Sequence, residues 1–215
     1  MIYTLLWKPK ACFETYFNKF VSRLTGGGAD GFCHSELVFK LTKREWITTL
    51  KTFTHGKIAE RAKSLTSRIN EIFDKADDTK DISLCFYTIW SSEMNLRLLT
   101  ANDSYVFNRL PDTRYTSSVT TDFSKEEERH ALAFCLSELH KKYDNVKAML
   151  FWVPRVGCFR RNVNILPDKY FCSEFVVYCF QQIGYAKNYT PENITPNDLP
   201  NILEEINDII KKNRI

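Results

Sequence analysis

The chain has 215 residues, of which 44% are hydrophobic and 26% charged, a composition typical of a globular protein with a sizeable core. Its net charge of +4 is only mildly basic, and the basic residues are spread along the chain, which argues against nucleic-acid binding. No stretch approaches the roughly 20 apolar residues of a membrane-spanning helix, and the start MIYTLLWKPK has a strand pattern rather than that of a signal peptide. We expect a single domain over residues 1–215.

The seven cysteines are an odd number, and no two of them form a Cys-x-x-Cys pair. This usage is typical of an intracellular protein with reduced thiols rather than of a disulfide framework. The glycine-rich segment TGGGADG, residues 25–31, lacks the Gly-Lys-Ser/Thr that completes a phosphate-binding loop, so it predicts a flexible connector. We therefore expect neither a cofactor nor a metal.

The first half of the chain predicts mostly strands. Ile2–Trp7 has a strand pattern, and Ala11–Leu24 carries apolar residues at helical spacing. Cys33–Leu41 is short and β-rich, and Ile82–Trp90 is apolar enough for a strand buried on both faces. The polar segment 43–80, with helical periodicity around Ile58–Phe73, is interpreted as an insertion packed at the edge of the domain. Further short strands are predicted at Arg97–Leu99, Tyr105–Arg109 and Tyr115–Val119.

The second half predicts helices. Ser124 opens one of them with a capping box, in which Glu127 is the third helical residue, and its apolar positions continue to about Tyr143. Another runs from about Cys172 to a terminating glycine, Gly184, and a last amphipathic helix covers Leu199–Lys212. Strands followed by helices indicate an α+β fold.

Cys172 stands at the N-terminal end of the apolar stripe of its helix, and Cys179 lies on the same stripe seven residues later. Free cysteine is often a buried core residue, which is the simplest interpretation of both and the one we expect for Cys179. The first turn of a helix, however, stabilises a thiolate through its unpaired N–H groups and its dipole. Cys172 is therefore also a candidate nucleophile, which would require a histidine base nearby.

Four histidines are available to serve as that base. His130 and His140 fall on a charged helix and His55 in the polar segment, so all three are expected at the surface. His34 differs because it begins the strand CHSELVF directly after the glycine-rich loop. It is either a structural histidine or the base.

Two stretches taken together, FCHSELVF at residues 32–39 and YFCSEFVVYCFQQIG at residues 170–184, resemble the permuted papain-like cysteine hydrolases. More narrowly, they resemble the NlpC-type branch that includes bacterial YiiX-like proteins and relatives in large DNA viruses. Softer matches are SSEMNLRL at 91–98, the pair Tyr143-Asp144 and ITPNDL at 194–199. The long polar segment after the first motif has no counterpart in the family.

In this family the histidine comes first, at the start of a strand, and the cysteine comes last, at the start of a helix. The resemblance therefore implies a permuted papain-like fold, with the nucleophile helix packed against an antiparallel sheet. It also implies that Cys172 attacks a carbonyl carbon while His34 accepts and later returns a proton. Tyr170, two residues before the cysteine, either lines the oxyanion site or packs in the core.

A third polar residue should hold the imidazole in the right tautomer, and in the family it comes from the strand beside the histidine strand. If Ile82–Trp90 runs antiparallel to the strand of His34, its C-terminal end places Ser92 and its two neighbours near the imidazole. Glu36 is the rival, because residues i and i+2 of a strand share a face. Ser92 and Glu36 are both retained as candidate catalytic residues.

The function that the resemblance implies is a thiol hydrolase, a peptidase, amidase, ester hydrolase or acyltransferase, acting on a peptide, amide or lipid-ester substrate. The alternative is a non-catalytic viral binding or virion-associated protein that keeps the fold and binds a virion or host partner. The expected location is the cytoplasm, or the host cytoplasm or virion if the protein is viral. A metal site of Cys33, His34 and Cys172 fits zinc spacing poorly.

Overall fold

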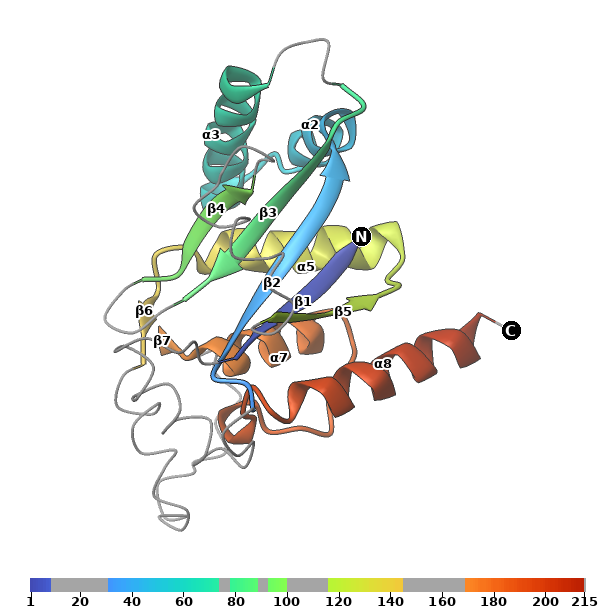
Figure 1. The fold of residues 1–215 in the computed structure, drawn as a ribbon. Helices are drawn as coiled ribbons and strands as arrows, with labels where there is room; N and C mark the ends of the chain where they lie inside the picture. Colours follow the sequence, from blue (N-terminus) through green and yellow to red (C-terminus); the bar gives the residue numbers. More distant parts are fainter. Residues whose placement is uncertain (9–30, 74–77, 89–92, 100–115, 145–168, 215) are drawn as a thin grey trace.

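The computed structural model describes residues 1–8, 31–73, 78–88, 93–99, 116–144 and 169–214, and these residues form an α+β fold (Figure 1). A five-stranded antiparallel sheet is its centre. The strands are β1 (Ile2–Trp7), β2 (His34–Thr42), β3 (Asp81–Tyr87), β4 (Asn95–Leu99), β5 (Thr116–Thr121), β6 (Lys142–Tyr143) and β7 (Lys169–Tyr170). The helices are α2 (Lys43–Lys51), α3 (Gly56–Ile72), α5 (Lys125–Glu138), α7 (Cys172–Gln182), α8 (Leu199–Asn213) and the 3-10 helix η3 (Pro191–Asn193).

The strand order is β4-β3-β2-β1-β5, which places β2 at the centre of the sheet. In register, Trp7 of β1 lies opposite His34, and Phe86 of β3 lies opposite Leu37. The strands predicted at Ile2–Trp7 and Cys33–Leu41 are confirmed, the second shifted by one residue. The antiparallel pairing of β3 with β2 is also confirmed, as is the burial of both faces of β3, although β3 ends at Tyr87 within the described residues.

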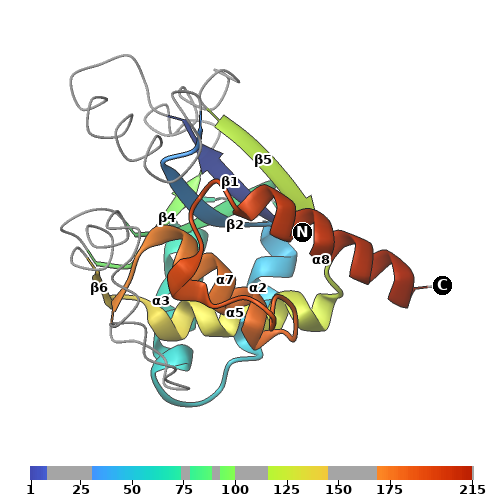
Figure 2. The same cartoon turned by 90° about the horizontal axis from the view of Figure 1, so that it is seen from below.

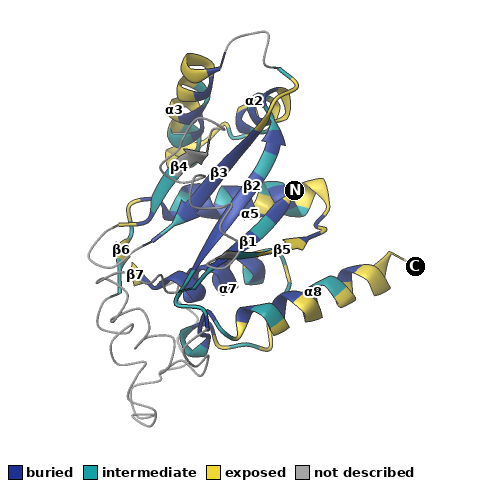
Figure 3. Ribbon diagram, in the orientation of Figure 1, coloured by how far each residue is buried: buried dark blue, intermediate teal, exposed yellow. Residues whose placement is uncertain are grey.

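Alternation along the strands divides the apolar side chains between the two faces of the sheet. Leu37 and Phe39 of β2 join the large core that α5 and α7 complete, so these helices cover one face (Figure 2). Val38 points the other way, into a small buried cluster with Leu5 and Cys85. Figure 3 shows the result as buried residues concentrated in the central strands and α7, and exposed residues on the outer sides of α3 and α8.

The polar segment 43–80 forms the helix pair α2 and α3, and these helices share the main core. The ring of Trp46 is fully buried and its Nε1–H donates to the carbonyl of Ile82, 2.9 Å away. Ala62, Leu65 and Ile69 from α3 enter the same cluster. The segment thus packs as part of the fold, while its origin as an insertion stays a prediction.

The ends of α5 and α7 have clear local causes. Ser124 and Glu127 form the predicted capping box at the start of α5. The helix stops at Glu138, earlier than predicted, because His140 adopts a left-handed backbone with φ of +69°. Gly184 follows α7 with φ of +95°, a conformation that glycine adopts readily.

Several predictions lie outside the described residues: the helix at Ala11–Leu24, most of the glycine-rich loop, the strand at Tyr105–Arg109, and Ser92 with its neighbour Ser91. The remaining short strands are confirmed as β4 and β5, with shifted ends. Among the described helices, none has both the length and the apolar character that crossing a lipid bilayer requires.

Candidate active site

His34 is the first residue of the central strand β2, at the end of the sheet where α7 begins (Figure 1). The N–H of the preceding residue, Cys33, donates to the carbonyl of Trp7 at 2.8 Å, so β1 holds the backbone at this point. The side chain of His34 is 20% exposed. It is thus largely enclosed by protein and still open to solvent on one side.

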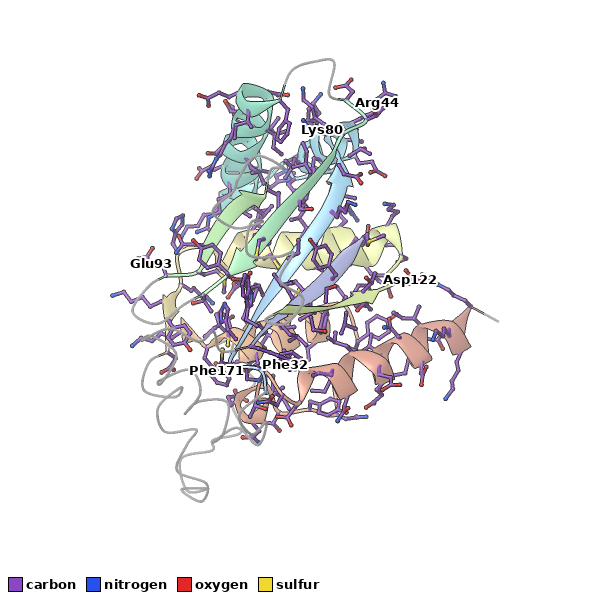
Figure 4. The ribbon with its side chains drawn as sticks, viewed as in Figure 1. Phe32, Arg44, Lys80, Glu93, Asp122 and Phe171 are labelled. Carbon is purple, nitrogen blue, oxygen red and sulfur yellow. The ribbon has the colours of Figure 1, made fainter. Side chains whose placement is uncertain are left out.

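Cys172 is the first residue of α7, as the sequence predicts, and is 6% exposed. The N–H of Phe171, just before it, donates to the carboxylate of Glu174 at 3.2 Å, which fixes the start of the helix. Figure 4 shows the labelled residues Phe171 and Phe32, the neighbours of the two candidate residues, at the same end of the sheet. Packing of α7 against β2 therefore brings the two motifs together.

The side chains of Cys172 and His34 lie close enough for each to shift the pKa of the other. Burial by itself would raise the pKa of the Cys172 thiol, but the positive charge of His34, hydrogen bonding with His34 and hydrogen bonding with the backbone of Ser35 lower that pKa below its ordinary value. Burial would likewise lower the pKa of His34, yet the charge and hydrogen bonds of Cys172 and Glu36 raise it to about 10. The two opposite shifts both favour a thiolate beside an imidazolium.

Glu36 is the third member of this group. Its Oε1 lies 3.3 Å from Nε2 of His34, and its Oε2 accepts a hydrogen bond from the thiol of Cys85 at 3.2 Å. The carboxylate is only 3% exposed. Because Glu36 engages Nε2, the other ring nitrogen, Nδ1, is the one that can serve the sulfur of Cys172.

The strand geometry explains how one imidazole meets both partners. Ser35 and Glu36 are consecutive, so their side chains point to opposite faces of β2. Cys172 approaches from the side of Ser35, and the carboxylate of Glu36 lies on the other side. His34 begins the strand, and from that end its ring reaches both.

The rival for this position is Ser92, together with its neighbours Ser91 and Glu93. Ser92 lies outside the described residues. Its neighbour Glu93 is half exposed, with Oε2 at 3.4 Å from Nδ1 of His140, and Figure 4 places it away from Phe32. Of the described candidates, the structure therefore brings Glu36 to His34.

The predictions for the other histidines are confirmed, since His55, His130 and His140 are exposed. Cys179 is buried in the core, with its sulfur 3.8 Å from that of Cys135, as expected for a structural thiol. The five described cysteines are free thiols, at positions 33, 85, 135, 172 and 179.

Cys33 is a second thiol near the candidate nucleophile, and its sulfur donates to the carbonyl of Trp7 at 3.4 Å. Burial first, and then the charge of Cys172, raise the pKa of Cys33 to about 12. Cys33 is therefore protonated at neutral pH, and its pKa shifts in the direction opposite to that of Cys172. The described residues contain no group of three His, Cys, Asp or Glu side chains arranged to hold a metal ion.

The two alternatives for Tyr170 are decided by its contacts. Its ring is almost fully buried and its hydroxyl donates to the carboxylate of Glu138, so Tyr170 packs in the core. Tyr143 is its partner in the β6–β7 register. Burial and then the charge of Cys172 raise the pKa of Tyr143, which keeps its hydroxyl protonated.

Sequence reasoning did not identify Ser35 as a partner of the sulfur. The signal was present, because Ser35 follows His34 directly and shares its strand, but no pattern in the sequence indicates which backbone N–H faces a distant cysteine.

Comparison of the chain with protein families, with curated proteins and with solved structures finds no match.

Proposed function

We propose that the protein is a cysteine hydrolase with a permuted papain-like fold, acting on an amide or ester carbonyl. The observation that supports it is the position of His34 between Cys172 and Glu36, where the pKa of the thiol is lowered, that of the imidazole is raised, and the Glu36 carboxylate lies 3.3 Å from the ring. This is the arrangement that nucleophilic catalysis by cysteine requires. The order of histidine before cysteine along the chain agrees with the resemblance to the permuted family.

In the first half of the reaction, the Cys172 thiolate attacks the carbonyl carbon and a carbon–sulfur bond forms. Backbone N–H groups in the first turn of α7, which have no acceptor within a helix, stabilise the negative oxygen. His34 donates its proton to the leaving nitrogen or oxygen as the bond to the carbonyl carbon breaks. An acyl-thioester on Cys172 and a neutral His34 result.

In the second half, a water molecule or an acceptor hydroxyl or amine attacks the thioester. His34 takes its proton, the carbon–sulfur bond breaks, and the Cys172 thiolate and the His34 imidazolium are restored. Glu36 keeps Nε2 of the ring engaged throughout, so that Nδ1 faces the reacting atoms. Peptides, amides and lipid esters are the substrate classes that this chemistry serves.

The experiment is competitive alkylation of the native protein with iodoacetamide at pH 7, followed by mass spectrometry of each cysteine. We expect Cys172 to react at least about tenfold faster than Cys33, since the pKa of Cys172 is lowered and that of Cys33 is raised. His34→Ala should remove that advantage, whereas His55→Ala, which changes an exposed histidine bonded to Thr54, should not. Folding of each variant is checked by circular dichroism.

Equal reactivity of Cys172 and Cys33 in the wild type would contradict the proposal. Activated Cys172 is then tested for turnover on fluorogenic ester and amide panels, with Cys172→Ala as the control. Activation without turnover on any panel would favour the non-catalytic alternative.

A further inference from the structure

The turn that follows η3, residues 194–198, contacts both halves of the candidate site. On one side, the N–H of Phe32 donates to Oδ1 of Asn197 at 2.6 Å, and Nδ2 of Asn197 donates to the carbonyl of Phe32 at 3.0 Å. The backbone N–H needs an oxygen and the carbonyl needs an N–H, so this pair of bonds also defines the orientation of the amide. A single side chain thus fixes both polar groups of one peptide residue.

Phe32 stands two residues before His34, at the point where the chain enters β2. The next residue, Cys33, is held by the carbonyl of Trp7 through its N–H. Asn197 is therefore a second contact, besides Trp7 of β1, that fixes the approach to β2.

The same turn is attached to the nucleophile helix. Ser173, the residue after Cys172, is fully buried, and its hydroxyl donates to the carbonyl of Ile194 at 2.6 Å. One end of the turn thus holds the first turn of α7, and Asn197 near the other end holds the entry to β2.

The turn is internally bonded. Asp198 accepts hydrogen bonds from both the N–H and the hydroxyl of Thr195, at 2.8 and 2.6 Å. The N–H of Asn197 donates to the hydroxyl of Thr195 at 3.2 Å, and α8 begins directly afterwards at Leu199. A short segment with this many internal bonds holds its two attachment points at a defined separation.

We propose that Asn197 is a positioning residue for the Cys172–His34 pair, which it acts on through the backbone of Phe32 while Ser173 anchors the same turn to α7. This inference rests on the proposed function. Loss of the Asn197 bonds lets the entry to β2 move relative to α7, and the hydrogen bond between sulfur and imidazole is then made for a smaller part of the time.

The test compares iodoacetamide alkylation of Cys172 at pH 6 and pH 9.5 in the full-length wild type, Asn197→Ala and Asn207→Ala. Asn207 is the matched control, since its Nδ2 also donates to a backbone carbonyl, that of Thr120, at 3.0 Å, but on α8 away from the site. We expect Asn197→Ala to slow the reaction about tenfold at pH 6 and less than about twofold at pH 9.5, where an ordinary cysteine is also a thiolate. Asn207→Ala should match the wild type at both pH values.

Thermal unfolding separates positioning from stability, because either substitution can lower the unfolding midpoint while only Asn197→Ala should change the pH dependence. Asn197→Asp keeps the acceptor for the N–H of Phe32 and loses the donor to its carbonyl, so we expect a rate between wild type and Asn197→Ala at pH 6. It also serves as the test if Asn197→Ala does not fold.

Ser173→Ala should reduce the rate at pH 6 in the same way, and the double variant should lose little more than the stronger single one, because both bonds act through one turn. A wild-type pH dependence in Asn197→Ala, or an equal change in Asn207→Ala, would overturn the inference. If the wild-type Cys172 itself reacts like an ordinary cysteine at both pH values, the proposed function fails instead.

Discussion

Oε1 of Glu36 lies 3.3 Å from Nε2 of His34, two residues earlier on the same strand, and both side chains are largely enclosed by protein. A second histidine–glutamate contact, between His140 and Glu93, has nearly the same separation of 3.4 Å but lies at the surface. Only the first of these contacts continues to a thiol, that of Cys172. Matched substitutions at the two pairs therefore distinguish an effect on the reactivity of Cys172 from the general effect of losing a histidine–glutamate contact.

Glu36→Gln should slow alkylation of Cys172 at pH 6 about tenfold, because loss of the buried negative charge lowers the pKa of His34 and with it the thiolate fraction. Glu93→Gln makes the same chemical change at the exposed pair and should leave the rate unaltered. The measurement is the rate of Cys172 modification by mass spectrometry. Equal rates in the two variants would show that Glu36 does not hold the imidazole for Cys172.

The pH profile of alkylation should have two limbs when the reagent is iodoacetate, an anion attracted by the imidazolium. The rate rises as pH rises through the lowered pKa of Cys172, and it falls again as pH rises through about 10, where His34 loses its proton. Neutral iodoacetamide should lack the second limb. A single rise near the ordinary cysteine value of about 8.5 with both reagents would mean that no ion pair exists.

Cys179→Ala should change stability and leave the reactivity of Cys172 intact. Its sulfur packs against Cys135 in the core, so its removal leaves a small cavity and should cost about 1 kcal/mol in the free energy of unfolding. The check is urea denaturation together with the alkylation rate of Cys172. A large fall in that rate would assign Cys179 a part in the site.

Trp46→Ala should destabilise the whole fold by about 3–5 kcal/mol, since the ring is fully buried in the main core and bonded to Ile82. Ile72→Ala, at an exposed position of α3, should cost less than about 0.5 kcal/mol. Both values come from denaturant unfolding followed by circular dichroism. Equal, small effects would indicate that the helix pair α2–α3 is not part of the cooperative core.

Local patterns in the sequence predicted the elements that carry the site. Alternating apolar residues specified β1 and β2, the Ser124–Glu127 pair specified the start of α5, and the apolar stripe with Gly184 specified α7. Each of these patterns involves residues only a few positions apart. Their spacing is set by the local geometry of the helix or strand and by which of its faces is buried. The end of α5 differed because the left-handed backbone of His140 ends the helix without altering its apolar period.

Only the tertiary structure decided how the side chains of the site meet. The contact of His34 with Cys172 and the pair of hydrogen bonds between Asn197 and Phe32 join residues from distant parts of the chain, and the choice of Glu36 as the partner of His34 became visible only in the folded strand. Such contacts depend on how α7 and the turn after η3 pack against the end of β2. The sequence by itself determined which residue types stand at the starts of a strand and a helix, whereas the long-range packing of α7 against β2 determined that they lie together.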